Sequence, residues 1–374
     1  MSLAPQKPSV PFFNYRGAFA KDREKFMEIM GDVLDRGAFI MQKDVFDFEA
    51  NLAKFVGAKH AFGLANGTDA IQIGLMAGGL KQGDEVLFPS HTMVATPSAI
   101  AMAGGVPVPV EMGADHMMDH TDLERHITSK TKAICPVQVN GRTCNMDAIQ
   151  AVCDQHGLFI VEDAAQGLGS KWKGRSAGTF GAAGTFSFYP AKVLGCFGDG
   201  GGLVTNDDEV ADKVTMLRDH GRRADGEIRT WGFNSRLDNM QAAILNFQLA
   251  TYDEVIARRR EIAGLYQSLL GDMEQLTLPP APDADPDHFD VYQNYEIEAD
   301  RRDELKAHLG ENNIGTLIQW SGKAVHQWPG LGFKVSLPKT ERFFERCLMI
   351  PMNMTMTNDD VAYVAETIRG FYSA

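Results

Sequence analysis

The chain has 374 residues, of which 44% are hydrophobic and 23% charged, values typical of a globular protein with a sizeable core. Its formal net charge of −13 argues against a general nucleic-acid or membrane-surface binder, because phosphate backbones demand a net positive contact surface. Five cysteines, an odd number without a Cys-x-x-Cys pair, make a disulfide framework or a zinc site unexpected and favour a reducing compartment.

No segment of the sequence has the pattern of a targeting or membrane-spanning element. The N-terminal stretch MSLAPQKPSVPFFNYRG lacks an apolar core of signal-peptide length. No apolar run approaches the roughly 18 residues that a membrane span needs. We therefore expect a soluble, cytoplasmic protein.

Short β-type runs alternate with helical patterns through the first part of the chain. The predicted strands are His60–Ala65, Glu85–Ser90, Gly105–Val110, Lys132–Val139, Leu158–Glu162, Gly184–Phe188 and Gly202–Thr205. Helices are predicted between several of them, at Asp69–Gly78, Met146–His156 and Asp207–Arg218. This alternation is typical of an α/β protein with a mostly parallel seven-stranded sheet flanked by helices.

The second part of the chain shows a different order of elements. A long helical stretch is predicted from about Asp238 to Leu270, and residues 278–290, rich in proline and aspartate, are expected to form a connection. The elements predicted after it are strand Val291–Ile297, helix Arg301–Asn312, strand Gly315–Gln319 and a final helix–strand–helix. We expect a large domain over residues 1–270 and a smaller α+β domain over residues 271–374.

Four short segments carry polar residues that together suit an active site. They are Asn66–Asp69 (NGTD), Val161–Gln166 (VEDAAQ), Ser187–Lys192 (SFYPAK) and Gly232–Arg236 (GFNSR). They offer an amine, a carboxylate and donors for a phosphate group. These are the groups that a pyridoxal-phosphate (PLP) site needs.

Lys192 is the candidate amine, and Asp163 is the candidate carboxylate. Lys192 lies in a turn with Pro190, before a glycine-rich stretch that lets a lysine project into a cleft. Position alone favours the ordinary alternative, a solvated surface lysine. Asp163 follows a predicted buried strand, where open α/β sheets place their ligands, and a buried carboxylate needs a partner such as a protonated pyridine nitrogen. The alternative for Asp163 is a helix N-cap for the turn at Ala164.

Gly67 and Thr68 are the candidate phosphate ligands. They precede the predicted helix Asp69–Gly78, and backbone N–H groups at a helix N-terminus, assisted by a hydroxyl, bind phosphate. Ser187 would add a second hydroxyl, and Gln166 could donate to the phenolic oxygen of the ring. The ordinary alternatives are an N-cap threonine and a strand serine whose bonds are satisfied.

Two other kinds of site are not expected. The glycine run Gly198–Gly202 lacks the G-x-G-x-x-G spacing and precedes a strand, so a dinucleotide site is rejected. His91, His116 and His120 have no supporting ligand pattern, so no metal site is predicted.

Taken in order, these segments resemble the DegT/StrS-type sugar aminotransferases over about residues 36–371. The matching segments are NGTDA, GDEVLFPSHTMVAT, VEDAAQGLGS, TFSFYPAKVLGCFGDGG, GFNSRLDNMQAAIL and LPKTERFFERCLMIPMNMTMTNDDVAYVAETIRGF. The resemblance implies a homodimeric fold type I enzyme that uses PLP to move an amino group from glutamate to a keto sugar. That sugar is expected to be nucleotide-linked and to serve cell-surface polysaccharide or antibiotic biosynthesis.

The resemblance also implies a role for each candidate. Lys192 would bind the cofactor as a Schiff base and move the proton in both half-reactions, and Asp163 would meet the pyridine nitrogen. Gln166 would contact the phenolic oxygen. The phosphate would be held by Gly67, Thr68 and Ser187, and by Asn234 from the neighbouring subunit.

Several positions depart from the family's pattern. Met93 stands where the family usually stacks an aromatic residue on the ring, although a thioether can also cover a ring face. Residues Phe39–Gln42 replace a segment that often carries glycine near the substrate. His326 matches a family histidine near the sugar, but its surroundings, Gln319–Lys323, differ, which indicates an unusual sugar.

Two rival functions remain open at this point. A PLP-dependent sugar dehydratase of the same fold carries histidine at the lysine position, and Lys192 argues against it. A non-catalytic binding or regulatory homologue is opposed by the complete set of Lys192, Asp163, Ser187 and Thr68.

Overall fold

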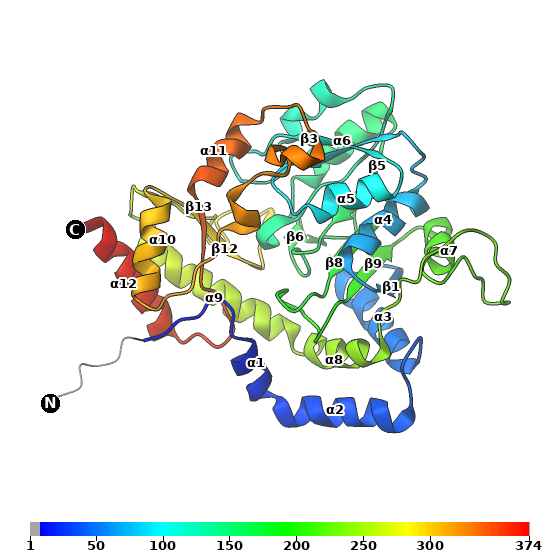
Figure 1. Cartoon of the computed structure of the whole chain (residues 1–374), viewed down its shortest axis with the longest axis horizontal. Coiled ribbons are helices and arrows are strands. Elements are labelled where there is room, and N and C mark those ends of the chain that lie inside the picture. Colours follow the sequence, from blue (N-terminus) through cyan, green and yellow to red (C-terminus); the bar gives the residue numbers. More distant parts are fainter. Residues whose placement is uncertain (1–7, 374) are drawn as a thin grey trace.

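The structure, a computed structural model, describes residues 8–373. Its centre is a seven-stranded sheet with the strand order β1-β9-β8-β5-β4-β2-β3 (Figure 1). The strands are β1 (His60–Leu64), β2 (Glu85–Pro89), β3 (Val106–Val110), β4 (Thr131–Ile134), β5 (Phe159–Asp163), β8 (Ala183–Ser187) and β9 (Gly201–Thr205). All neighbours are parallel except β9, which runs antiparallel to both β1 and β8. The predicted α/β class and mostly parallel sheet are confirmed.

Helices cover both faces of this sheet. One face carries α4 (Gly67–Gly78), α5 (Ala95–Met102) and α7 (Asp208–Leu217). The other carries α3 (Lys43–Val56), α6 (Met146–His156), α8 (Asn239–Leu249) and the first half of α9 (Tyr252–Leu270). Successive strand residues alternate between the faces, as a pleated strand requires: Phe62 and Leu64 pack with α4, and Ala61 packs with α3. Strands buried on both faces explain the continuous apolar runs of the sequence.

A second core lies beyond the sheet. It is built on the antiparallel sheet β10-β12-β13 and on the last helices, and it also contains the C-terminal half of α9, through Ile262 and Tyr266, and Val10. Its elements are β10 (Leu276–Thr277), β12 (Tyr295–Ala299), β13 (Cys347–Ile350), α10 (Arg302–Glu311), α11 (Pro338–Arg346) and α12 (Asn358–Ser373). Because α9 contributes to both cores, it ties them together. The division of the chain after residue 270 stays a prediction.

The remaining elements are short or N-terminal. The helices α1 (Tyr15–Lys21) and α2 (Arg23–Arg36) precede the sheet, and α2 packs against α8 (Figure 1). A third sheet has the order β11-β6-β7, formed by β11 (His288–Phe289), β6 (Lys171–Trp172) and β7 (Arg175–Ser176). The proline-rich connection therefore contains one short strand, β11, which pairs with β6.

Several of the predicted elements differ from the structure. The strand predicted at Lys132–Val139 is β4, which ends at Ile134, and the strand predicted at Val291–Ile297 is β12, which begins at Tyr295. The stretch from Asp238 to Leu270 is two helices, because Thr251 leaves the helical conformation (φ −118°, ψ 18°) before the chain turns toward the second core. The predicted strand Gly315–Gln319 is wrong: only Leu317 forms a bridge, to Met349. Left-handed backbone at Trp320 (φ 45°) and Ser321 (φ 62°) bends the chain away from the sheet directly afterwards.

Along residues 8–373, every helix is too short or too polar to cross a lipid bilayer.

Candidate active site

The candidate residues meet at one edge of the central sheet. Asp163 is the last residue of β5, Ser187 is the last residue of β8, and α4 begins at Gly67, shortly after β1. The strands β1 and β8 both run antiparallel to β9, and β5 is parallel to β8, so the carboxyl ends of all three strands lie at the same edge. Ligands of open α/β sheets bind at such an edge.

Gly67 brings the N-terminus of α4 against the end of β8. A Cβ atom at Gly67 would lie 3.0 Å from the Ser187 Cβ, so a larger residue here would push the end of β8 away by a few tenths of an ångström. Asn66 caps α4 by accepting a hydrogen bond from the N–H of Asp69 at 2.8 Å. The earlier N–H groups of the helix, those of Gly67 and Thr68, point with the helix dipole toward an anion. With the hydroxyls of Thr68 and Ser187, they form a seat that suits a phosphate group.

Asp163 is a buried carboxylate whose hydrogen-bond partners are neutral. Its side chain is 4% exposed. The hydroxyl of Thr96 donates to Oδ2 at 2.7 Å, and the N–H of Ala165 donates to Oδ1 at 3.1 Å. Burial raises the pKa of Asp163 above its ordinary value, although these two bonds and the charge of Lys192 oppose the rise. A cationic N–H group would offset the cost of burying this charge, which a protonated pyridine nitrogen supplies.

Lys192 and Asp163 act on each other electrostatically. Burial lowers the pKa of the Lys192 amine, and the carboxylate of Asp163 partly raises it again. The N–H of Lys192 donates to the carbonyl of Tyr189 at 2.8 Å, which closes the turn that carries the lysine. A lowered pKa increases the share of neutral amine, the form that attacks a carbonyl carbon and accepts a proton.

Gln166 has its side-chain amide fixed in one orientation. Its Oε1 accepts a hydrogen bond from the backbone N–H of Asn140 at 2.7 Å. Because a backbone N–H can only donate, the other end of the amide must be the NH₂ group. That group is the donor that the phenolic oxygen of a PLP ring needs.

Two contributors to the site were missed in the sequence. Thr96 bonds to Asp163, and its hydroxyl also lies 2.7 Å from that of Thr92. Their spacing of four residues, with Thr92 just before α5 and Thr96 in its first turn, was an available signal. Asn140 holds Gln166 from a left-handed backbone position (φ 55°), and the Asn-Gly pair that it forms with Gly141 is typical of such turns.

The positions of the other predicted residues, Met93, Asn234 and His326, do not by themselves assign them a contact to cofactor or substrate. Met93, in the loop after β2, is 51% exposed at the same sheet edge, and Asn234 is also exposed. Their contacts to a ring and to a neighbouring subunit's phosphate stay predictions. His326 is buried, with Nδ1 2.7 Å from the Ser90 hydroxyl and Nε2 3.0 Å from the Glu341 carboxylate. Since both ring nitrogens are engaged, His326 ties its loop to the end of β2, and its contact to a sugar stays a prediction.

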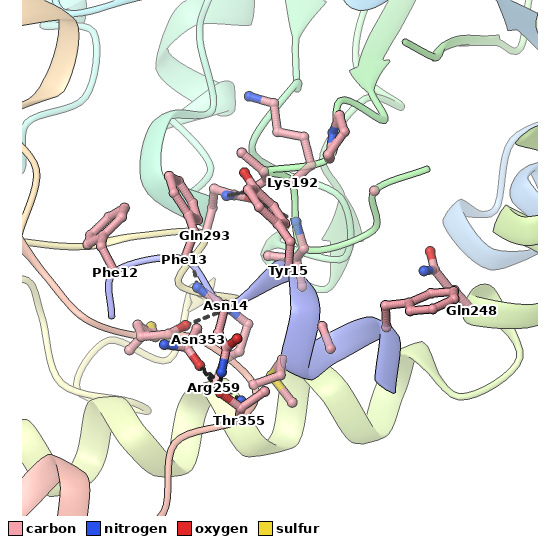
Figure 2. Close-up of a pocket in the computed structure, with 18 of the residues that line it drawn as sticks. Phe12, Phe13, Asn14, Tyr15, Lys192, Gln248, Arg259, Gln293, Asn353 and Thr355 are labelled. Atoms are coloured by element: carbon pink, nitrogen blue, oxygen red, sulfur yellow. Dashed lines mark hydrogen bonds between the residues drawn. The ribbon is translucent and has the colours of Figure 1, made fainter. Parts of the chain in front are cut away.

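A cavity of about 430 Å³ lies behind the turn that carries Lys192. It is lined by the N-terminal residues Phe12–Tyr15, by Arg259 and Gln293, and by the stem of Lys192. Figure 2 shows the Lys192 amine pointing away from these N-terminal residues. Neither Asp163 nor Ser187 belongs to its lining, so this cavity is distinct from the sheet edge where those two residues lie.

Within the described range of the chain, no three His, Cys, Asp or Glu side chains converge where a metal ion could bind.

The chain is similar to known proteins over nearly its whole length. The model of the DegT/DnrJ/EryC1/StrS aminotransferase family matches residues 20–369. A dTDP-3-amino-3,4,6-trideoxy-alpha-D-glucose transaminase of Streptomyces venezuelae is 39% identical over 375 residues, which cover 99% of this chain and 98% of that protein. The crystal structure of S. venezuelae DesV in complex with a ketimine intermediate has a TM-score of 0.94 at 38% identity, over 98% of this chain and 99% of that one. The structure of NtdA from Bacillus subtilis with bound cofactor PMP has a TM-score of 0.90 at 26% identity, over 100% of this chain and 87% of that one.

Proposed function

Since the chain belongs to the DegT/DnrJ/EryC1/StrS aminotransferase family, whose members are PLP-dependent transaminases, we propose that it transfers an amino group from glutamate to a nucleotide-linked keto sugar. One observation carries the proposal. The charges of the buried Asp163 carboxylate and the Lys192 amine act on each other, and burial lowers the pKa of that amine. Asp163 ends a strand at the sheet edge where α4 begins. The rival dehydratase and binding-protein functions lack such an observation.

The residues at this edge fit PLP. When bound, PLP supplies an electron sink that stabilises the negative charge left on a substrate carbon after its proton leaves. Asp163 would keep the pyridine nitrogen protonated, and the NH₂ group of Gln166 would donate to the phenolic oxygen. Gly67 and Thr68, with Ser187, would hold the phosphate. Asp163 has neutral partners and Gln166 a fixed amide, so both are prepared for these bonds before the cofactor binds.

Lys192 has two tasks in this proposal. Its Nζ would bind the cofactor covalently, and after the amino donor displaces it, the free amine would move protons. The Nζ atom accepts the proton of the donor's α-carbon in the first half-reaction and returns one to the sugar carbon in the second. An amine with a lowered pKa suits both directions, because it is neither permanently charged nor too weak a base.

A second copy of the chain would complete the site. The segment between α7 and α8 projects from the body of the protein (Figure 1), and it carries Trp231, 95% exposed, and Ile228, 66% exposed. Large apolar side chains on one projecting segment favour a protein interface. Asn234, also exposed, lies in the same segment, where its backbone bridges to Asp219. We propose a homodimer in which Asn234 reaches the partner's cofactor phosphate.

The substrate class and the compartment belong to the same proposal. The 39% identical relative is named for a dTDP-linked amino sugar, which supports a nucleotide-linked acceptor here, for polysaccharide or antibiotic biosynthesis. The five cysteines are free and buried, which suits a cytoplasmic protein.

A panel of acceptors tests the proposed function. We expect glutamate to bleach the visible absorption band of the cofactor and a nucleotide-linked keto sugar to restore it, with one 2-oxoglutarate released per amino sugar. Free keto sugars should show a kcat/KM at least about 100-fold lower, because the nucleotide contributes binding energy remote from the reacting carbon. The measurement is 2-oxoglutarate release with dTDP- and UDP-linked 3-keto and 4-keto sugars. Turnover with simple 2-oxo acids but with none of these sugars would contradict the proposal.

A further inference from the structure

The side chain of Gln293 forms hydrogen bonds with the backbone on both sides of Lys192. Its Nε2 donates to the carbonyl of Ala191 at 2.9 Å, and its Oε1 accepts from the N–H of Val193 at 2.9 Å. Figure 2 shows Gln293 beside Lys192, across the rear of the lysine turn. The side chain is 7% exposed, so water does not compete strongly for these bonds. Its amide orientation is unambiguous, because one partner can only accept and the other can only donate.

Gln293 is itself held in place by a buried arginine. Arg259 of α9 donates to the carbonyls of Tyr292 and Gln293, both at 2.7 Å, and to that of Met352 at 2.8 Å. Its three partners are carbonyl groups, and burial lowers the pKa of Arg259 to about 10. The peptide at Gln293 also abuts Gly141, where a Cβ atom would lie 2.6 Å from the Gln293 nitrogen. The position of this side chain is therefore fixed from two elements.

The next residue, Asn294, reaches the other side of the site. Its Nδ2 donates to Oδ1 of Asn140 at 2.8 Å, and Asn140 holds Gln166 through its own N–H. The side chain of Asn140 also donates to the buried carboxylate of Glu296 at 2.6 Å. Two consecutive residues thus connect to two different cofactor contacts: Gln293 to Lys192 directly, and Asn294 to Gln166 through Asn140.

We propose that the Gln293–Asn294 pair is a positioning element for the transamination: Gln293 aims the reactive lysine, and Asn294 aims the donor to the ring oxygen. This inference rests on the proposed function and adds residues that touch neither substrate nor cofactor. The turn with Lys192 lies between Pro190 and Gly195. The lysine side chain is long and flexible, so the position of its amine depends on hydrogen bonds from other elements that fix the backbone of this turn. Because proton transfer depends on near-ångström placement, loss of that hold should slow the chemistry more than it weakens substrate binding.

The test replaces Gln293 by methionine, which has similar length but cannot make either hydrogen bond. We expect kcat to fall about 10- to 100-fold, as for misplacement by about 1 Å. The KM for glutamate should stay within about threefold, because the binding contacts are kept. The pH midpoint of the cofactor's absorption band should also move, because the lysine leaves its place beside Asp163. Asn294→Leu should weaken PLP binding about 3- to 10-fold, the expected effect of one misaligned hydrogen bond.

Gln248→Met is the matched control. Gln248 lines the same cavity from α8, and within residues 8–373 its Oε1 has no hydrogen-bond partner. It should keep the kcat and the spectrum of the wild type. If Gln293→Met is too unstable to purify, Gln293→Asn, which keeps the amide but is too short to span both bonds, should show the same loss of kcat.

The possible failures can be told apart. A wild-type protein that binds no PLP would overturn the proposed function and this inference together. A wild type with a normal absorption band, beside a Gln293→Met variant with unchanged kcat and unchanged midpoint, would overturn the inference alone. A lower melting temperature with unchanged kcat would do the same, because it would assign Gln293 a purely structural role.

Discussion

Replacing Lys192 by alanine is expected to abolish transamination and to remove the visible absorption band that the lysine-bound cofactor produces. Burial lowers the pKa of the Lys192 amine, and the charge of Asp163 acts on it; in the proposed function both covalent binding and proton transfer depend on this amine. Loss of general acid–base catalysis alone costs about 10²- to 10⁴-fold, and loss of the covalent link adds to this. The measurements are kcat with glutamate and keto sugar, and the absorption spectrum after addition of PLP.

Lys173→Ala is the control for this variant. Lys173 is a surface lysine whose pKa is raised by its hydrogen bond to Asp147, far from the chemistry proposed here, and its loss should leave kcat unchanged. Mixing Lys192→Ala with Asn234→Ala subunits should restore activity, because a hybrid dimer contains one site with both residues intact. Full turnover by Lys192→Ala alone would refute the assignment, and a mixture as inactive as its parts would refute the shared site.

Replacing Asp163 by asparagine is expected to lower kcat by roughly 10²- to 10⁴-fold, because breaking a buried charge pair costs about 3–5 kcal/mol. An amide cannot keep the pyridine nitrogen protonated, so the ring would lose most of its capacity to absorb negative charge. The hydrogen bonds at this position can be kept in part, since the amide oxygen can still accept from the N–H of Ala165. The measurement is kcat at saturating glutamate and sugar.

The same substitution should not destabilise the cofactor-free protein. The folded state raises the pKa of Asp163 above its ordinary value, so the stability linked to this carboxyl is present at acid pH and is lost as the pH rises through the folded-state pKa. At pH 7 the charged form is a cost that asparagine removes. The melting temperature of cofactor-free Asp163→Asn should therefore equal or exceed that of the wild type. For the kcat prediction, an unchanged kcat of Asp163→Asn would show that the ring nitrogen does not bind Asp163.

Most of the central sheet could be predicted because burial leaves a pattern of apolar residues within each strand itself. Strands such as β5 are buried on both faces and appear as short apolar runs, and α6 was predicted with its observed bounds, Met146–His156. The strand expected at Gly315–Gln319 fits the same local criteria, but the bend at Trp320 and Ser321 leaves a single bridge there. The break between α8 and α9 likewise reflects the path of the chain toward its second core, which no local pattern records.

Some residues of the candidate site could likewise be predicted from the sequence, and others could not. Asp163 and Ser187 end strands and Gly67 follows one, and the sheet brings these strand ends to one edge, so their chain order was informative. Gln293 could not be predicted, because it bonds to Ala191 across 102 residues of sequence and is chemically an ordinary glutamine. His326 could be located by resemblance, but its engagement by Ser90 and Glu341 is visible only in three dimensions.

The crystal structure of the protein grown with PLP is the most direct test of the central claim. We expect continuous electron density from the Lys192 Nζ to the cofactor, the pyridine nitrogen within hydrogen-bond distance of the Asp163 carboxylate, and the phosphate at the N-terminus of α4. Density that joins PLP to a different lysine, or a ring nitrogen that faces away from Asp163, would contradict the account.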